Sequence, residues 1–305
     1  MNAAPALLGY AAVVGIVAPR VMVRSAWPHR APALGAAVWL ALTVSFTFAA
    51  ALAASRPATP TEHLHAGLVG LLHACDLGTG EEARAVPDPG TAHRLATALP
   101  LAVLAAFLGA FALRLLRACL LRARHRDRLD KVGVRCDRLR ATVLPHGAPA
   151  AYCLPGFRSR VVVSDGAVRL LTDEQLDAVL AHERAHIAGR HHLLIAATSA
   201  FADVFPWVPL ARRAREQMAI LVEMSADDRA LRRHSHEVLA TAMYEIAAGR
   251  APKGALGAAG SAAVLRVKRI LGPRRAPHPA LRGSVASLAV AVPLLPLLVA
   301  CPPGV

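Results

Sequence analysis

The sequence predicts a mainly α-helical membrane protein with a small α+β domain inserted between the third and fourth of four transmembrane helices. Two observations predict this class. The 305 residues are 55% hydrophobic and only 18% charged, whereas a soluble domain carries about 25% charged residues. The apolar residues are also gathered into four uncharged blocks, each long enough to cross a bilayer. This composition excludes an intrinsically disordered chain and a simple soluble enzyme.

The uncharged blocks cover residues 3–19, 31–55, 95–113 and 283–301. We therefore expect transmembrane helices over about 3–22, 31–55 and 95–113, and a fourth in the segment 283–305, which ends in a short tail. The first block lacks the basic residues that precede the apolar core of a signal peptide, so we interpret it as an uncleaved helix.

Basic residues set the expected orientation. Three arginines lie between the first two blocks, the loop 56–94 is acidic, and seven basic residues lie between 114 and 131. Basic loops face the cytoplasm, so we predict an N-terminus outside, an extracytoplasmic loop 56–94 and a cytosolic domain 114–282. The Arg, Ala and Pro bias suggests a GC-rich bacterial genome, so we expect the membrane to be the cytoplasmic membrane of a bacterium.

The net charge of +15 admits two interpretations. A basic surface can bind nucleic acid, but no DNA-binding motif accompanies the run at 114–131. We interpret that run as an anchor on anionic lipid and expect no direct contact with nucleic acid. The expected partners are a protein substrate and the lipid bilayer.

Five scattered cysteines, none in a CxxC pair, exclude a disulfide framework and a zinc ribbon. Cys75 and Cys301 both fall outside the cell in this topology. They could pair as a disulfide or remain two free thiols.

The predicted cytosolic domain begins with short β-type runs at 141–145, 150–153 and 160–164, separated by Pro and Gly turns. The period then changes. Thr172 and Gln175 form a capping box, and apolar residues follow at helical spacing. We predict a helix over 173–188 that stops at Gly189.

That helix carries His182-Glu183-Arg184-Ala185-His186, an HExxH motif. Its two histidines lie one turn apart, so both imidazoles project from one face and can bind one metal ion. Glu183 lies about 100° around the helix, where it can act as general base toward water activated by zinc.

A catalytic zinc site needs three protein ligands, and two residues compete for the third place. His192 completes the spacing of the metzincin pattern. Glu223 shares a face of a later predicted helix with Asp227, which would then hydrogen-bond a ligand histidine. The residues alone leave this choice open.

The cytosolic segment resembles the BlaR/MecR-type integral membrane metallopeptidases, which are relatives of the HtpX and CAAX-endopeptidase group. The resemblance is carried by the segments 161–166, 170–176, 178–186 and 190–192 and by Glu223-x-x-Ala226-Asp227. The order of three spans, a zinc domain and a last span also matches. Only hydropathy supports the resemblance in the spans themselves.

The resemblance implies a small gluzincin domain that holds one Zn²⁺ per chain through His182, His186 and Glu223, with Asp227 behind a ligand histidine. It implies an edge strand that binds an extended substrate, which we expect at Arg160, Val161, Val162, Val163 and Ser164. The transition-state oxyanion also needs a donor. The candidates are His234, His236, Arg229 and Tyr244, and the sequence does not choose among them.

The implied function is a zinc endopeptidase that cleaves a cytosolic or membrane protein in regulated proteolysis, such as a transcriptional repressor. An HtpX-like quality-control protease and a non-proteolytic zinc-binding membrane regulator are the alternatives. The antibiotic sensors of the family carry a penicillin-binding domain after the last span. This chain contains no Ser-x-x-Lys motif, so it is not expected to sense β-lactams in that way. The oligomeric state is not predicted.

Two further stretches are ambiguous. The segment 193–210 is nearly as apolar as a span but is interrupted by Asp203 and two prolines. We expect it to pack as a buried continuation of the domain rather than against lipid. The basic stretch Arg266–Arg269 is expected to be a solvated or lipid-facing surface.

Overall fold

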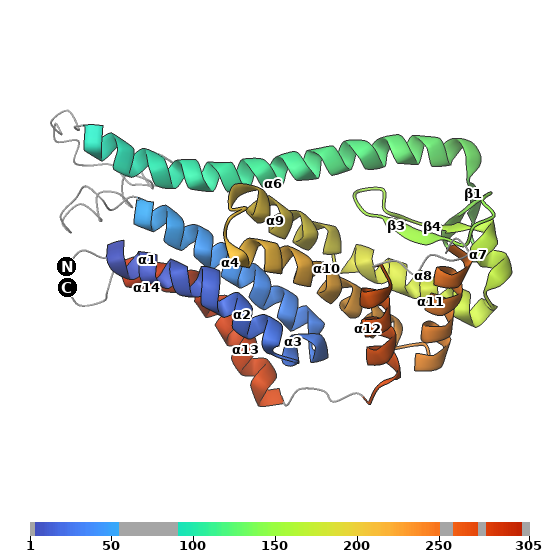
Figure 1. The fold of residues 1–305 in the computed structure, drawn as a ribbon. Helices are drawn as coiled ribbons and strands as arrows, with labels where there is room; N and C mark the ends of the chain where they lie inside the picture. Colours follow the sequence, from blue (N-terminus) through green and yellow to red (C-terminus); the bar gives the residue numbers. More distant parts are fainter. Residues whose placement is uncertain (1–3, 55–90, 251–258, 274–278, 301–305) are drawn as a thin grey trace.

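The computed structural model describes residues 4–54, 91–250, 259–273 and 279–300. Within these ranges the chain is mostly helical and has one small sheet, as predicted (Figure 1). Cys75, Cys301 and most of the loop 56–94 lie outside the described residues. In the described part of the chain, three helices are long and apolar enough to cross a membrane.

The first two of these helices form an N-terminal hairpin. The first consists of α1 (Ala4–Ala12), a π-helical turn η1 (Val13–Val17) and α2 (Ala18–Arg24). The short α3 (Trp27–Arg30) leads into α4 (Pro32–Ala54). Pro19 comes just after the π-helical turn and has no backbone N–H, so one hydrogen bond of this continuous helix is missing there.

The third helix is longer than expected. The apolar block 95–113 and the basic stretch that follows form one 42-residue helix, α6 (Thr91–Val132). It runs alongside the rest of the molecule to the sheet (Figure 1). Arg114 begins the basic part and donates two hydrogen bonds of 2.5 Å to the Asp203 carboxylate.

The last apolar block is a broken helix rather than a continuous span. It consists of α13 (Pro279–Ala291), a 3₁₀ turn η3 (Val292–Leu294) and α14 (Leu295–Ala300). Pro296 has no N–H to donate to the Val292 carbonyl. That carbonyl instead accepts from Ser45 Oγ at 2.8 Å and Tyr10 OH at 3.2 Å. A fourth membrane crossing therefore stays a prediction.

The sheet contains β1 (Val134–Cys136), β2 (Ala141–Leu144), β3 (Ala151–Leu154) and β4 (Arg160–Ser164) in the order β1-β2-β4-β3. The first strand was not predicted. β4 runs parallel to β2 and antiparallel to β3, so Arg160, Val161, Val162, Val163 and Ser164 form an interior strand. The expectation that this strand is the free edge was wrong, because both of its sides are already hydrogen-bonded; the edges are β1 and β3.

Helices α7 (Asp165–Leu170) and α8 (Asp173–Ala188) follow the sheet. The predicted boundaries of α8 are confirmed. Thr172 accepts from the Gln175 N–H, the Gln175 side chain accepts from the Thr172 N–H, and Gly189 is the C-cap. Both start signals and the stop signal are local, which explains why the sequence could place this helix.

A hairpin of α9 (His191–Val204) and α10 (Pro209–Ala230) packs against the N-terminal helices. Phe201 and Phe205 meet Phe46 of α4 edge-to-face, with ring centroids 5.7 and 5.3 Å apart. The expected burial holds for Phe201, Phe205, Val208 and Leu210, whereas Ile195 and Trp207 are exposed. That 193–210 lies away from lipid stays a prediction. The chain then continues through α11 (His236–Arg250) and α12 (Ala259–Leu271), which lie beside α8 and α10 (Figure 1).

Candidate metal centre

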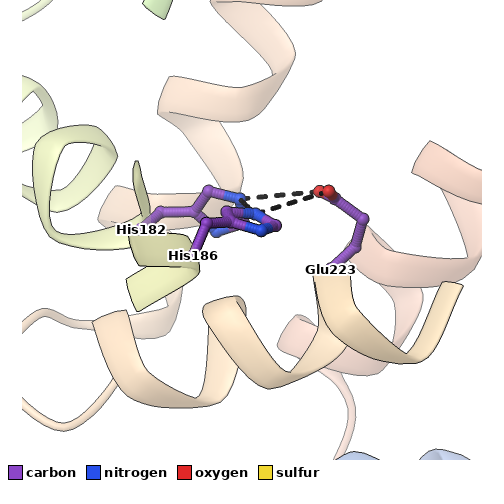
Figure 2. A group of neighbouring side chains, drawn as sticks. All are labelled: His182, His186 and Glu223. Atoms are coloured by element: carbon purple, nitrogen blue, oxygen red, sulfur yellow. Dashed lines mark hydrogen bonds and ion pairs between the residues drawn. The ribbon is translucent and has the colours of Figure 1, made fainter. Parts of the chain in front are cut away.

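Two helices bring three potential metal ligands together. His182 and His186 project from one face of α8, and Glu223 projects toward them from α10 (Figure 2). One ligand atom from each of the three lies within 4.8 Å of the others. His192, the other candidate for the third ligand, is not part of this group. The structure therefore favours Glu223 as the third ligand.

The spacing of these atoms fits a tetrahedral zinc ion. With bonds of about 2.0–2.1 Å, neighbouring ligands of such an ion stand about 3.3–3.4 Å apart. The Nε2 atoms of His182 and His186 are 3.1 Å apart. The Glu223 carboxylate oxygens lie 3.5 Å from His182 Nε2 and 3.4 Å from His186 Nε2. The donor set of two imidazoles and one carboxylate leaves a fourth position open.

Asp227 and Arg266 form a buried ion-pair network with His182 and Glu223. The Asp227 side chain is completely buried, and its Oδ1 lies 3.0 Å from His182 Nδ1. This contact has the length of a hydrogen bond but not its direction. Arg266 on α12 donates two bonds of 2.7 and 2.8 Å to Asp227 and contacts Glu223 at 2.8 Å. Burying these charges is tolerated because each has an opposite partner.

The network shifts the pKa values of its members. Burial alone would lower the pKa of His182, but its contacts with Asp227 and Glu223 raise it to about 9. Burial would raise the pKa of Asp227, but Arg266 and His182 lower it to about 2. The pKa of Glu223 is lowered for the same reason, mainly by His182 against the effect of burial. In the metal-free protein, protonated His182 and Arg266 together thus balance the two carboxylates.

Zinc binding at pH 7 is therefore expected to release about one proton from His182, because a histidine binds a metal ion only as the deprotonated, neutral imidazole. Below pH 9, the apparent affinity should rise about tenfold per pH unit as this competing proton is removed. Calorimetric titration in two buffers of different ionisation enthalpy counts the released protons. Zinc binding without proton release would contradict the raised pKa.

The turn after α8 directs a further histidine at the site. Arg190 adopts a left-handed conformation with φ of 47°, and His191 is folded back so that its Nδ1 lies 2.9 Å from His186 Nδ1. A Cβ atom on Gly189 would come within 2.3 Å of the His191 ring, so a larger residue at this position would displace that ring. Burial lowers the pKa of His191 to about 4, which leaves it neutral and able to accept from His186 Nδ1–H.

We expect His191→Ala to weaken zinc binding by about 10- to 100-fold, the usual cost of removing the partner that orients a ligand histidine. His192→Ala is the matched control, since His192 is adjacent but outside the converging group. Zinc affinity of the two variants is compared by competition with a chromogenic chelator. Equal affinities would show that His191 does not position His186.

The remaining part of the HExxH motif also lies at this site. Burial has the largest effect on the Glu183 carboxyl and raises its pKa. The charge of His182 lowers this pKa and that of Glu223 raises it, and the pKa stays above its ordinary value. Cys153 of β3 lies near the Glu183 carboxylate, and burial, followed by the negative charge of Glu183, raises the pKa of its thiol to about 12. The thiol therefore stays protonated beside Glu183.

The proposed oxyanion donors have different surroundings in the structure. His236 Nδ1 contacts the Ile270 carbonyl at 2.5 Å, and Tyr244 is 71% exposed. Arg229 lines a cavity between α10 and the start of α4. Arg266, which we expected on the surface, is instead the cation of the network. The sequence carries little signal for this role, because Arg266 is one of three basic residues between 266 and 269.

Residues 120–232 match the family model of Peptidase family M48. This segment is less than half of the chain, but it contains the HExxH helix, β1–β4 and the helix that carries Glu223. Arg266 lies beyond it. No curated protein and no solved structure matches the chain. Members of this family are metallopeptidases that generally use zinc, so residues 120–232 support a metallopeptidase function.

Proposed function

We propose that this chain is an integral membrane zinc endopeptidase that hydrolyses peptide bonds of a cytosolic or membrane protein. The observation that carries the proposal is the convergence of His182, His186 and Glu223 beside the carboxylate of Glu183. The first three residues would hold the ion. A bound zinc ion supplies Lewis acidity toward a carbonyl oxygen and makes water a better nucleophile.

Glu183 would take the proton of the attacking water and then deliver it to the leaving amine. Its raised pKa suits both steps, because a general base works best when its pKa approaches the working pH. Asp227 would hold His182 in place through Nδ1, and His191 would do the same for His186. Hydrolysis in this scheme forms no covalent bond between substrate and protein.

The substrate would lie along β3. This strand is hydrogen-bonded to β4 on one side only, so its other side can pair with an extended peptide. Its Cys153 contacts Glu183, and a peptide added to β3 would therefore pass the general base. β3 takes the role that we had expected for residues 160–164.

Glu183→Gln is expected to reduce peptide hydrolysis by about 10²- to 10⁴-fold, the usual contribution of a general base. Zinc content should stay near one per chain, since Glu183 is not a ligand. Asp177→Asn, an exposed carboxylate on the same helix, is the matched control. Wild-type activity in cells that carry the Glu183→Gln variant would favour the alternative hypothesis of a non-proteolytic regulator.

The substrate range separates the two proteolytic alternatives. Cleavage of a regulatory protein such as a repressor would create one or a few new N-termini that depend on Glu183. Quality control would create many, mostly in unfolded membrane proteins. Quantitative N-terminal proteomics of wild-type and Glu183→Gln cells measures this directly. The proposed membrane orientation, with the N-terminus outside and residues 114–282 in the cytoplasm, is tested by labelling cysteines introduced into each loop.

A further inference from the structure

A cavity of about 970 Å³ lies between the metal-bearing helices and the apolar N-terminal helices. Its first wall is formed by α3, the start of α4 and the start of α13. Its second wall is formed by α10, the turn after α8 and the end of α12. Ala185 of the HExxH segment lines it, but His182, Glu183, His186 and Glu223 do not, so the cavity is distinct from the metal centre.

The cavity is strongly cationic. One acidic residue, Asp228, lines it, and that carboxylate is bonded to Arg269 at 2.8 Å. Over the described ranges, the other lining arginines have no carboxylate within ion-pair distance. These four unpaired arginines come from both walls: Arg30, Arg229, Arg232 and Arg282.

The wall formed by α4 is apolar. It presents Ala33, Leu34, Ala36, Ala37 and Leu40 to the cavity. Arginines around an apolar wall match a ligand that has an anionic head and hydrocarbon chains. A free phosphate ion would leave the apolar wall in contact with water.

The position of the cavity agrees with such a ligand. The end of α2, the start of α4 and the start of α13 all meet at this side of the molecule (Figure 1). In a membrane-inserted chain, helices that enter and leave the bilayer at one level place this cavity in the headgroup region. Arg282 stands at the start of the last apolar segment, and Arg30 stands just before α4.

We propose that this cavity binds the headgroup of an acidic phospholipid, with the four arginines around the phosphate and the acyl chains along α4. Gly189 and His191 also line it. A lipid bound there would contact the turn that carries His191 to His186. The proposal requires membrane insertion but not peptidase activity, and its test is a binding measurement.

The full-length chain is purified in uncharged detergent and titrated with short-chain phosphatidylglycerol or phosphatidylcholine. Binding is followed by the shift in unfolding temperature. We expect saturable binding of phosphatidylglycerol and at least tenfold weaker binding of phosphatidylcholine. Arg229→Gln/Arg232→Gln should raise the Kd for phosphatidylglycerol about 30-fold, from the typical contribution of two basic residues near an anionic surface.

Arg135→Gln/Arg158→Gln removes the same charge from exposed positions beside the sheet and should leave the Kd within twofold. Arg30→Gln/Arg282→Gln repeats the test on the opposite wall, should the first variant not fold. Equal binding of the two lipids, or an unchanged Kd in both cavity variants, would overturn the proposal. Displacement by millimolar inorganic phosphate would make this a free-anion site. Binding of an acidic peptide in place of lipid would assign it to a protein partner.

Discussion

Glu223→Ala is expected to yield a folded chain without zinc and without measurable peptide hydrolysis. Two imidazoles remain in this variant, but the site loses its only anionic ligand and one of three contacts. Arg266 would then lie beside the ion with one carboxylate fewer to balance it, because it now contacts both Glu223 and Asp227. Elemental analysis of detergent-purified protein, prepared without chelator, measures zinc per chain.

Two variants control this result. Glu216→Ala removes an exposed carboxylate from the same helix, and His192→Ala removes the competing histidine; both should keep about one zinc. Zinc lost in His192→Ala and kept in Glu223→Ala would indicate a metzincin-like ligand set. A zinc-free wild-type protein would contradict the proposed enzyme altogether.

Arg266→Met is expected to lower the free energy of unfolding by about 3–5 kcal/mol, the typical cost of leaving one partner of a buried ion pair alone. Asp227 is completely buried and receives two hydrogen bonds from this arginine. Without them its charge is balanced only by His182. Chemical denaturation of the metal-free chain measures the loss, and Lys268→Met, an exposed cation on the same helix, is the control.

A double-mutant cycle identifies the cause. In Arg266→Met/Asp227→Asn the buried charge is removed with its partner, so we expect the double variant to be more stable than Arg266→Met alone. Strictly additive losses would show that Arg266 stabilises α12 by packing and not through Asp227.

The sequence predicted what short-range signals determine. The capping box and Gly189 fixed both ends of α8, and the four-residue spacing of the histidines placed them on one face. The order of the strands depends on contacts between distant segments, so periodicity alone could not show that 160–164 is an interior strand. Arg266 joins a carboxylate 39 residues away in the chain, and no local pattern marks such a partner.

Two helical segments also differ from what hydropathy alone predicts. The α6 helix passes its expected end near residue 113 because the basic residues that follow are good helix formers and no glycine or proline interrupts them before Gly133. In the last apolar block, Pro293 and Pro296 break a stretch whose hydropathy alone predicts a continuous helix.

The unbroken course of α6 has a mechanical consequence. A helix of 42 residues is about 63 Å long at 1.5 Å per residue. Arg114 is bound to Asp203, so the part of α6 after it is an arm of about 27 Å, and a tilt of about 10° about this contact moves the end of the arm by about 5 Å, close to one helical turn. β1 begins two residues after the helix ends, and His125 near that end contacts Tyr152 of β3 at 2.7 Å. A tilt of α6 about Arg114 is thus transmitted, as by a lever, to the strand beside Glu183.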